Sequence, residues 1–130
     1  MSRLEERIEN FNKAFELYEK TVHNFDWNNE ITHLALVQAF EICSELSWKV
    51  LKDYLYENGI DVSLPKKVIK EAFNKKVIKN GQIWINMLEA RNATTHEYNM
   101  EKVKLLLQNI SKIFYEELNT FHIWINSDEI

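Results

Sequence analysis

The sequence contains very little glycine, proline or cysteine, and it has no long apolar run. Two glycines and one proline in 130 residues are too few for the many tight turns of an all-β fold, so we expect long helices with short connections. Cys43 is the only cysteine, which excludes an internal disulfide, and its apolar neighbours indicate a core residue. No apolar run approaches the ~18–20 residues of a membrane-spanning helix. The charged first residues lack the apolar stretch of a secretory signal, and we expect a cytoplasmic protein without a membrane partner.

Charge is distributed unevenly along the chain. The net charge of −4 means that the protein as a whole does not attract nucleic acid. Between positions 66 and 79, however, six lysines stand against one acid, Glu71. Lys66, Lys67 and Lys70 are candidate contacts for RNA phosphates or for a partner protein. The simpler alternative is a solvated helix face.

Apolar side chains, among them Phe11, Phe40 and Ile110, recur at helical spacing and form apolar stripes along most of the sequence. We expect helices from about Leu4 to Val22, from Asn29 to Asn58, a short one from Pro65, one from about Gln82 to Tyr98, and one from Asn99 past Phe121. Ser2, Asn29 and Ser63 suit helix starts, and Gly59 suits a stop. These elements predict an all-α fold: an antiparallel four-helix up-and-down bundle with one additional short helix, formed by residues 1–130 as one domain.

For two aromatic residues, the helix face on which they fall leads to a specific prediction. Phe73 falls with Val68, Ile69 and Ala72 on the expected buried face of the short helix. Trp48 falls among charged residues on the outer face of the second helix. It could cover the edge of the core beside Leu51 and Leu55, or it could contact a partner, and the sequence favours neither.

The segment RNATTHEYNM contains Arg91, the only arginine after Arg7. On a regular helix, Arg91 shares a stripe with Trp84 and Leu88 and lies at the edge of the apolar face. Burying a guanidinium is costly unless an acid or a phosphate pairs with it. Arginine is preferred over lysine where two-pronged recognition of such an anion matters. We therefore expect Arg91 to bind an anion.

Arg91, Asn92 and His96 are residue types that suit metal-free RNA cleavage. Histidine can act as base or acid near neutral pH, arginine can stabilise the charged phosphate, and Asn92 can orient either group. On one straight helix Arg91 and His96 diverge by about 140°, so the helix must distort or two chains must pool their side chains across a twofold axis. By residue type alone, a structural Arg–Glu pair is the stronger interpretation.

The spacing of this segment resembles that of a known superfamily. RNATTHEY fits the R-x4-H-x-Y form of the HEPN superfamily motif. Three segments resemble, in order, the nucleotidyltransferase substrate-binding family and its HepT-like toxins: LVQAFEICSELSWKVLKDYLYENGI, PKKVIKEAF and GQIWINMLEARNATTHEY. The resemblance extends from about Phe11 to the last helix.

The resemblance implies a dimeric helical bundle that binds a minimal nucleotidyltransferase. In the toxin–antitoxin branch the bundle is a metal-independent ribonuclease with no cofactor, and the nucleotidyltransferase silences it by transferring AMP to the motif tyrosine. Carried to this sequence, Arg91 and His96 would be catalytic with support from Asn92, and Tyr98 would accept AMP. The implied partners are the nucleotidyltransferase, an RNA substrate and a second copy of the chain, or a higher oligomer.

Two other interpretations remain open. The chain could be a non-catalytic substrate-binding subunit of the nucleotidyltransferase, which also fits an outward Trp48. Alternatively, it could be a plain helical scaffold, in which case Arg91 would pair with Glu41 or Glu45 and be closed to solvent.

Overall fold

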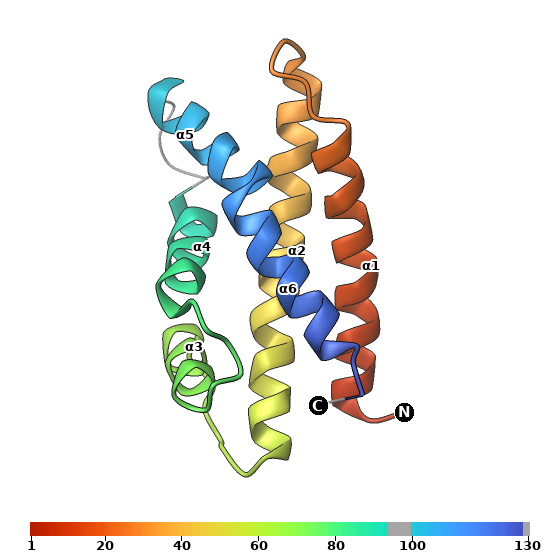
Figure 1. Ribbon diagram of the computed structural model, residues 1–130, viewed down its shortest axis with the longest axis vertical. Coiled ribbons are helices and arrows are strands. Elements are labelled where there is room, and N and C mark those ends of the chain that lie inside the picture. The colour runs from red at the N-terminus through yellow and green to blue at the C-terminus, as the bar shows by residue number, and fades with distance from the viewer. Residues whose placement is uncertain (94–99, 129–130) are drawn as a thin grey trace.

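The computed structural model describes residues 1–93 and 100–128, and this part of the chain forms six helices and no strand (Figure 1). They are α1 (Arg3–His23), α2 (Glu30–Glu57), α3 (Pro65–Asn74), α4 (Gly81–Ala93), α5 (Met100–Ser111) and α6 (Ile113–Ile125). In Figure 1, α1 and α4 run upward, whereas α2 and the consecutive helices α5 and α6 run downward, with α3 as the short extra element. The predicted all-α bundle is therefore confirmed.

Several predicted helix ends are present in the structure. Ser2 caps α1, because its hydroxyl accepts the Glu5 N–H at 3.1 Å. Asn29 caps α2, because its side-chain oxygen accepts the Ile31 N–H at 3.0 Å. Gly59, just after α2, has a φ of +85°, a conformation that favours glycine. These local signals fix the start of α1 and both ends of α2.

The prediction that Ser63 caps the third helix is wrong. The N-cap position of α3 is Leu64, which makes no side-chain cap hydrogen bond. Pro65 occupies the first turn as expected, and its lack of an N–H removes one of the donors that a cap would satisfy.

The predicted last helix is divided at Lys112 into α5 and α6. Two donors converge on the carbonyl of Gln108: the Lys112 N–H at 3.2 Å and the Ser111 hydroxyl at 3.2 Å. A serine that donates back to its own helix competes with the backbone ladder and bends it. The break is one residue long, because the Glu116 N–H again reaches the Lys112 carbonyl at 3.0 Å.

The core is built from aromatic and aliphatic side chains of all six helices. Its largest fully buried members are Tyr18, Phe11, Phe40, Leu36, Leu51, Leu55, Met87, Ile110, Leu118, Ile125, Val50 and Val68. Cys43 is fully buried, as predicted, and burial raises the pKa of its thiol. Among the described residues, no helix is both long and apolar enough to cross a membrane.

For Phe73 alone among the predicted core residues of α3, the predicted burial is wrong, since half of the residue is exposed. Its ring instead lies against Gly81 at the start of α4, where a Cβ would stand 3.2 Å from the ring. Phe73 thus packs over a glycine at the edge of the bundle, while Val68, Ile69 and Ala72 are buried as expected.

Candidate functional site

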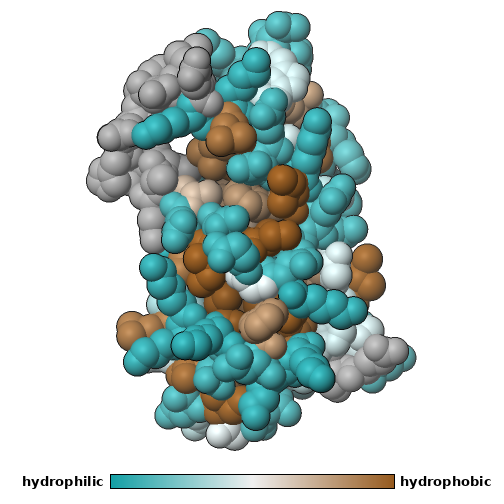
Figure 2. Space-filling model, turned by 60° about the vertical axis from the view of Figure 1, so that its left-hand side comes forward, coloured by the Kyte–Doolittle hydropathy of each residue, from teal (hydrophilic) through white to brown (hydrophobic). Residues whose placement is uncertain are grey.

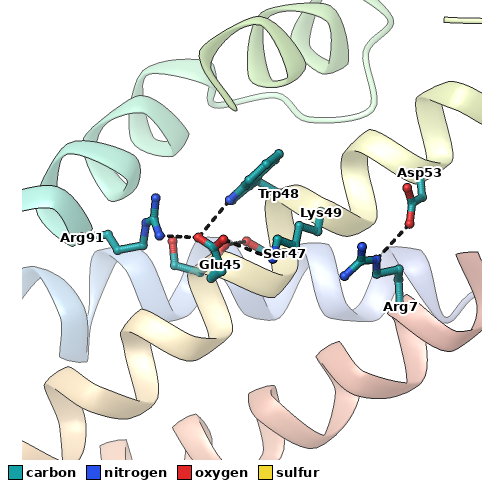
Figure 3. A network of polar contacts seen from close by, with 8 residues as sticks. Arg7, Glu45, Ser47, Trp48, Lys49, Asp53 and Arg91 are labelled. Carbon is teal, nitrogen blue, oxygen red and sulfur yellow. Dashed lines mark hydrogen bonds and ion pairs between the residues drawn. The ribbon is translucent and has the colours of Figure 1, made fainter. Parts of the chain in front are cut away.

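Arg91 lies in the last turn of α4 and forms an ion pair with Glu45 of α2 (Figure 3). The pair joins Nη1 of Arg91 to Oε2 of Glu45, with 27% of the arginine side chain and 31% of the glutamate side chain exposed. The arginine side chain is therefore held against α2 and is only partly buried. The anion predicted for Arg91 is, in this structure, a carboxylate of the same chain.

Glu45 is held by two further groups from its own helix. Trp48 donates its indole N–H to Oε2 at 3.2 Å, and the Lys49 ammonium lies 3.3 Å from Oε1. Burial acts to raise the pKa of Glu45, but the Trp48 hydrogen bond and the charges of Arg91 and Lys49 outweigh it, and the pKa is lowered. Glu45 is consequently a carboxylate at neutral pH, and it orients the guanidinium beside it.

The scaffold interpretation predicted two things about Arg91. Its pairing with Glu45 is confirmed. Its closure from solvent is wrong, because about a quarter of the side chain remains exposed. A guanidinium fixed in direction can stabilise a negative charge that develops beside it.

Trp48 is partly buried and packs against the edge of the core, which was one of the two alternatives for this residue. Its indole N–H is used by Glu45. A partner contact through its remaining surface stays a prediction.

The other motif residues fall in a part of the chain that the structure does not describe. His96 and Tyr98 lie outside the described residues, and so does the side chain of Asn92, although its backbone belongs to α4. The predicted meeting of Arg91 and His96 is therefore untested. The predicted start of the last helix at Asn99 falls in the same segment.

A second arginine–carboxylate pair was missed from the sequence. Asp53 of α2 is 7% exposed, and its Oδ2 accepts the Arg7 Nε–H at 3.1 Å, with Arg3 3.6 Å away (Figure 3). The signal that could have found it is the i, i+4 spacing of Arg3 and Arg7, which puts two guanidinium groups on one face of α1. All three arginines of the chain thus pair with acids on α2.

The predicted basic segment forms an exposed surface on α3 and the following loop. Its six lysines are all exposed: Lys66, Lys67, Lys70, Lys75, Lys76 and Lys79. None of the ion pairs seen among the described residues involves them. Figure 2 turns this side of the bundle towards the viewer and shows hydrophilic surface broken by scattered apolar side chains. The same described part of the chain contains no group of three or more histidine, cysteine or acidic side chains that could hold a metal ion.

Comparison with known proteins gives matches of three kinds: a family, a named relative and a solved structure. Residues 6–126 match the family described as "Nucleotidyltransferase substrate binding protein like". A Haemophilus influenzae protein named "Probable ribonuclease HepT" is 29% identical over 85 residues, which are 62% of this chain and 58% of that protein. This chain therefore matches less than two thirds of that relative's length. A crystal structure of a Thermus thermophilus protein has the same fold, with a TM-score of 0.82 at 21% identity over 90% of this chain and 99% of the other.

Proposed function

The chain belongs to the nucleotidyltransferase substrate-binding family, and from this premise we propose that it is a metal-independent ribonuclease toxin controlled by a nucleotidyltransferase. The observation that carries the proposal is Arg91, held by Glu45 at the end of α4 and partly open to solvent. The name of the Haemophilus influenzae relative supports the choice of reaction.

In the proposed reaction, His96 removes the proton from a ribose 2′-hydroxyl, and the 2′-oxygen attacks the adjacent phosphorus. The bond from phosphorus to the 5′-oxygen breaks, and that oxygen takes up a proton from an acid, which a second His96 across the dimer can supply. Arg91 stabilises the additional negative charge on the phosphate oxygens during the attack. Asn92 orients His96 or the substrate.

An exposed apolar row on α2 supports the dimer that this mechanism needs. Ile31 is 75% exposed, Leu34 72% and Ile42 40%. Their spacing of 3 and 8 residues puts them on the same face of α2 as Glu45. Exposed apolar surface beside a candidate site is typical of a protein–protein interface. A twofold axis along this row would bring two copies of Arg91 towards one cleft.

Cleavage of RNA in the presence of EDTA tests the proposal. Arg91→Ala and His96→Ala are each expected to lower the rate by about 10²–10⁴-fold. The matched control is Arg3→Ala, which removes an arginine whose side chain is 68% exposed and leaves Arg7 paired with Asp53. Unchanged cleavage by His96→Ala, with a native circular dichroism spectrum, would remove the nuclease from consideration.

The dimer is tested separately by Leu34→Glu. We expect this variant to elute as a monomer and to lose cleavage. Leu17→Glu is the control, since Leu17 is likewise an exposed leucine, with 50% of it accessible, but lies on α1. If Leu34→Glu remained as large as the unmodified chain and fully active, the proposed axis would be wrong.

Control by the nucleotidyltransferase is proposed to act through Tyr98. Its phenolic oxygen attacks the α-phosphorus of ATP, an O–P bond forms, pyrophosphate leaves and the phenolic proton passes to solvent. The attached phosphate would then compete with RNA for Arg91. Incubation with the partner enzyme and ATP should add the mass of AMP, and a Tyr98→Phe chain modified equally fast would exclude this tyrosine.

The exposed lysines of α3 are a proposed contact for RNA or for the nucleotidyltransferase. Lys66→Glu, Lys67→Glu and Lys70→Glu together should weaken binding to the true ligand and reduce its dependence on salt. Binding of both ligands unchanged by this triple variant would assign the lysines to a solvated face.

The alternative function is a non-catalytic subunit that presents a substrate to the nucleotidyltransferase. The description of the family as substrate-binding and the pairing of Arg91 with Glu45 favour it. It predicts stoichiometric co-purification with the nucleotidyltransferase and no RNA cleavage. Toxicity on expression that Arg91→Ala relieves would favour the nuclease instead.

A further inference from the structure

A shallow groove lies between the α1–α2 loop and α5. It is lined by Trp27, Lys104, Gln108 and Lys112 and has a volume of about 470 Å³. Lys104, Gln108 and Lys112 are spaced four apart along α5 and the break that follows it, and the Lys112 N–H still donates to the Gln108 carbonyl, so the three residues form one row. Trp27 stands opposite this row. The groove is open to solvent, unlike a closed pocket for a small apolar ligand.

The loop that carries Trp27 is held by several hydrogen bonds. The Asp26 N–H donates to the Thr32 hydroxyl at 3.0 Å, and the Asp26 carbonyl is within 3.0 Å of His33 Nε2. The Trp27 ring contacts Phe25 edge to face at 4.8 Å and His33 at 6.0 Å. Trp27 nevertheless remains 45% exposed. A large aromatic surface is thus presented to solvent in a position that the loop has already fixed, which lowers the entropy lost on binding.

The charge of the groove is positive, although the chain as a whole has a net charge of −4. Lys104 and Lys112 are both exposed, and no acid is among the lining residues. The nearest acid of the loop, Asp26, accepts the Asn28 N–H at 2.9 Å. An indole face beside two ammonium groups and an amide fits a nucleobase with its phosphates, because bases stack on aromatic rings while lysines follow the backbone.

The length of the row favours a strand over a single nucleotide. Lys112 is eight positions after Lys104, which at the helical rise of 1.5 Å per residue is about 12 Å along the axis. Figure 1 places the α1–α2 loop, the start of α5 and the end of α4 at the same end of the bundle. A strand in the groove could therefore extend towards Arg91.

We propose that this groove binds single-stranded RNA, with one base stacked on Trp27 and neighbouring phosphates on Lys104 and Lys112. The choice of RNA as the ligand rests on the proposed ribonuclease function. The groove itself lies outside the motif and adds a strand-binding site to it.

Binding of a fluorescent 2′-O-methyl RNA oligonucleotide tests the groove without cleavage, because the attacking hydroxyl is blocked. Trp27→Ala should raise the Kd about 5- to 100-fold, while Trp27→Phe should retain most of the affinity. Binding should quench the tryptophan fluorescence of the unmodified chain more than that of Trp27→Phe. Wild-type affinity in Trp27→Ala, with a native circular dichroism spectrum, would overturn the proposal.

The lysines are tested by the salt dependence of the same binding. Lys104→Gln with Lys112→Gln should reduce the slope of log K against log salt by about 1.4, that is, two contacts of about 0.7 each for a single strand. Lys13→Gln with Lys20→Gln is the control, since it removes the same charge from exposed residues of α1. An equal reduction of the slope in both double variants would show non-specific electrostatic attraction and would overturn the proposed site.

Two further ligands and a parallel assay separate the possible failures. ATP or a poly-glutamate peptide that bound the groove as tightly as the oligonucleotide would overturn the assignment to an RNA strand. Cleavage of unmodified RNA is measured alongside. Binding that depends on Trp27 without any cleavage would support the proposed RNA site in the groove and reject the ribonuclease function. Cleavage together with binding that does not depend on Trp27 would support the ribonuclease function and reject the groove as the RNA site.

Discussion

Replacement of Glu45 by glutamine measures how much the ion pair between Glu45 and Arg91 contributes to the free energy of unfolding. Glutamine retains the volume of Glu45 and an oxygen that can accept the Trp48 N–H, so the main loss is the charge opposite Arg91. Exposed ion pairs contribute about 0.2–1 kcal/mol, and breaking a buried pair costs about 3–5 kcal/mol. With 27% and 31% of the two side chains exposed, the pair lies between these limits. We expect Glu45→Gln to lower the free energy of unfolding by about 1–2 kcal/mol.

Urea denaturation followed by circular dichroism measures this loss, and the thermal midpoint should fall by roughly 3–8 °C. Glu9→Gln is the matched control, because its partner Lys13 lies 3.9 Å away and the two side chains are 52% and 74% exposed. It should cost less than about 0.5 kcal/mol. A double-mutant cycle with Arg91→Gln isolates the pair. Zero coupling in that cycle, or a Glu45→Gln chain as stable as the original, would refute the reasoning.

The pH dependence provides an independent check with a defined sign. The pKa of Glu45 is lowered in the folded chain, so its contribution is present above the unfolded value of about 4.3 and is lost as the pH falls through the folded value. The difference in stability between the unmodified chain and Glu45→Gln should therefore be constant near neutral pH and shrink below about pH 4.3. A difference that grew on acidification would contradict the assigned pKa direction.

Three further predictions concern the core. Tyr18 donates its hydroxyl to the Ile110 carbonyl, so Tyr18→Phe should cost about 1–3 kcal/mol in urea denaturation; unchanged stability would refute the bond. Burial lowers the pKa of His122 against the opposing charge of Glu19, so the unfolded chain protonates first, and stability should fall as the pH drops below about 6.5. His122→Phe should remove that slope, and a slope that persisted would belong to another group. Burial raises the pKa of Cys43, so Ellman's reagent should react with it only on unfolding; rapid reaction of the native chain would contradict its burial.

Periodicity predicted those parts of the fold that depend on which face of a helix meets the core. Phe11, Phe40 and Ile110 were placed on apolar stripes, and each is fully buried. Caps at Ser2 and Asn29 were also predicted, because the capping atoms are within three residues of their donors. Both kinds of signal are local, and neither requires knowledge of how helices are placed relative to each other.

The predictions that failed, or that the sequence did not make, depend on how the helices are placed relative to each other. Phe73 has core spacing, yet its ring lies over Gly81 at the bundle edge, because the turn between α3 and α4 sets their distance. Asp53 pairs with Arg7 across 46 residues, and the i, i+4 spacing of Arg3 and Arg7 marks one face of α1 but does not say which acid it meets. For the candidate site, the sequence identified Arg91 and offered Glu45 as one of two possible acids. The choice between them depended on the packing of α4 against α2.

The two arginine–carboxylate pairs on α2 show why residue type alone does not assign a role. Arg7 and Arg91 have equally exposed side chains, 27% in each case, but Asp53 is 9% exposed at the side chain and Glu45 31%. A nearly buried carboxylate requires its arginine, because an unpaired charge there is costly. Glu45 reaches water and also has Lys49 and Trp48 as partners, so it can release Arg91 to a phosphate at lower cost. The arginine that can exchange its anion is thus the one in the motif, at the end of α4, which is why Arg91, and not Arg7, is the proposed catalytic arginine.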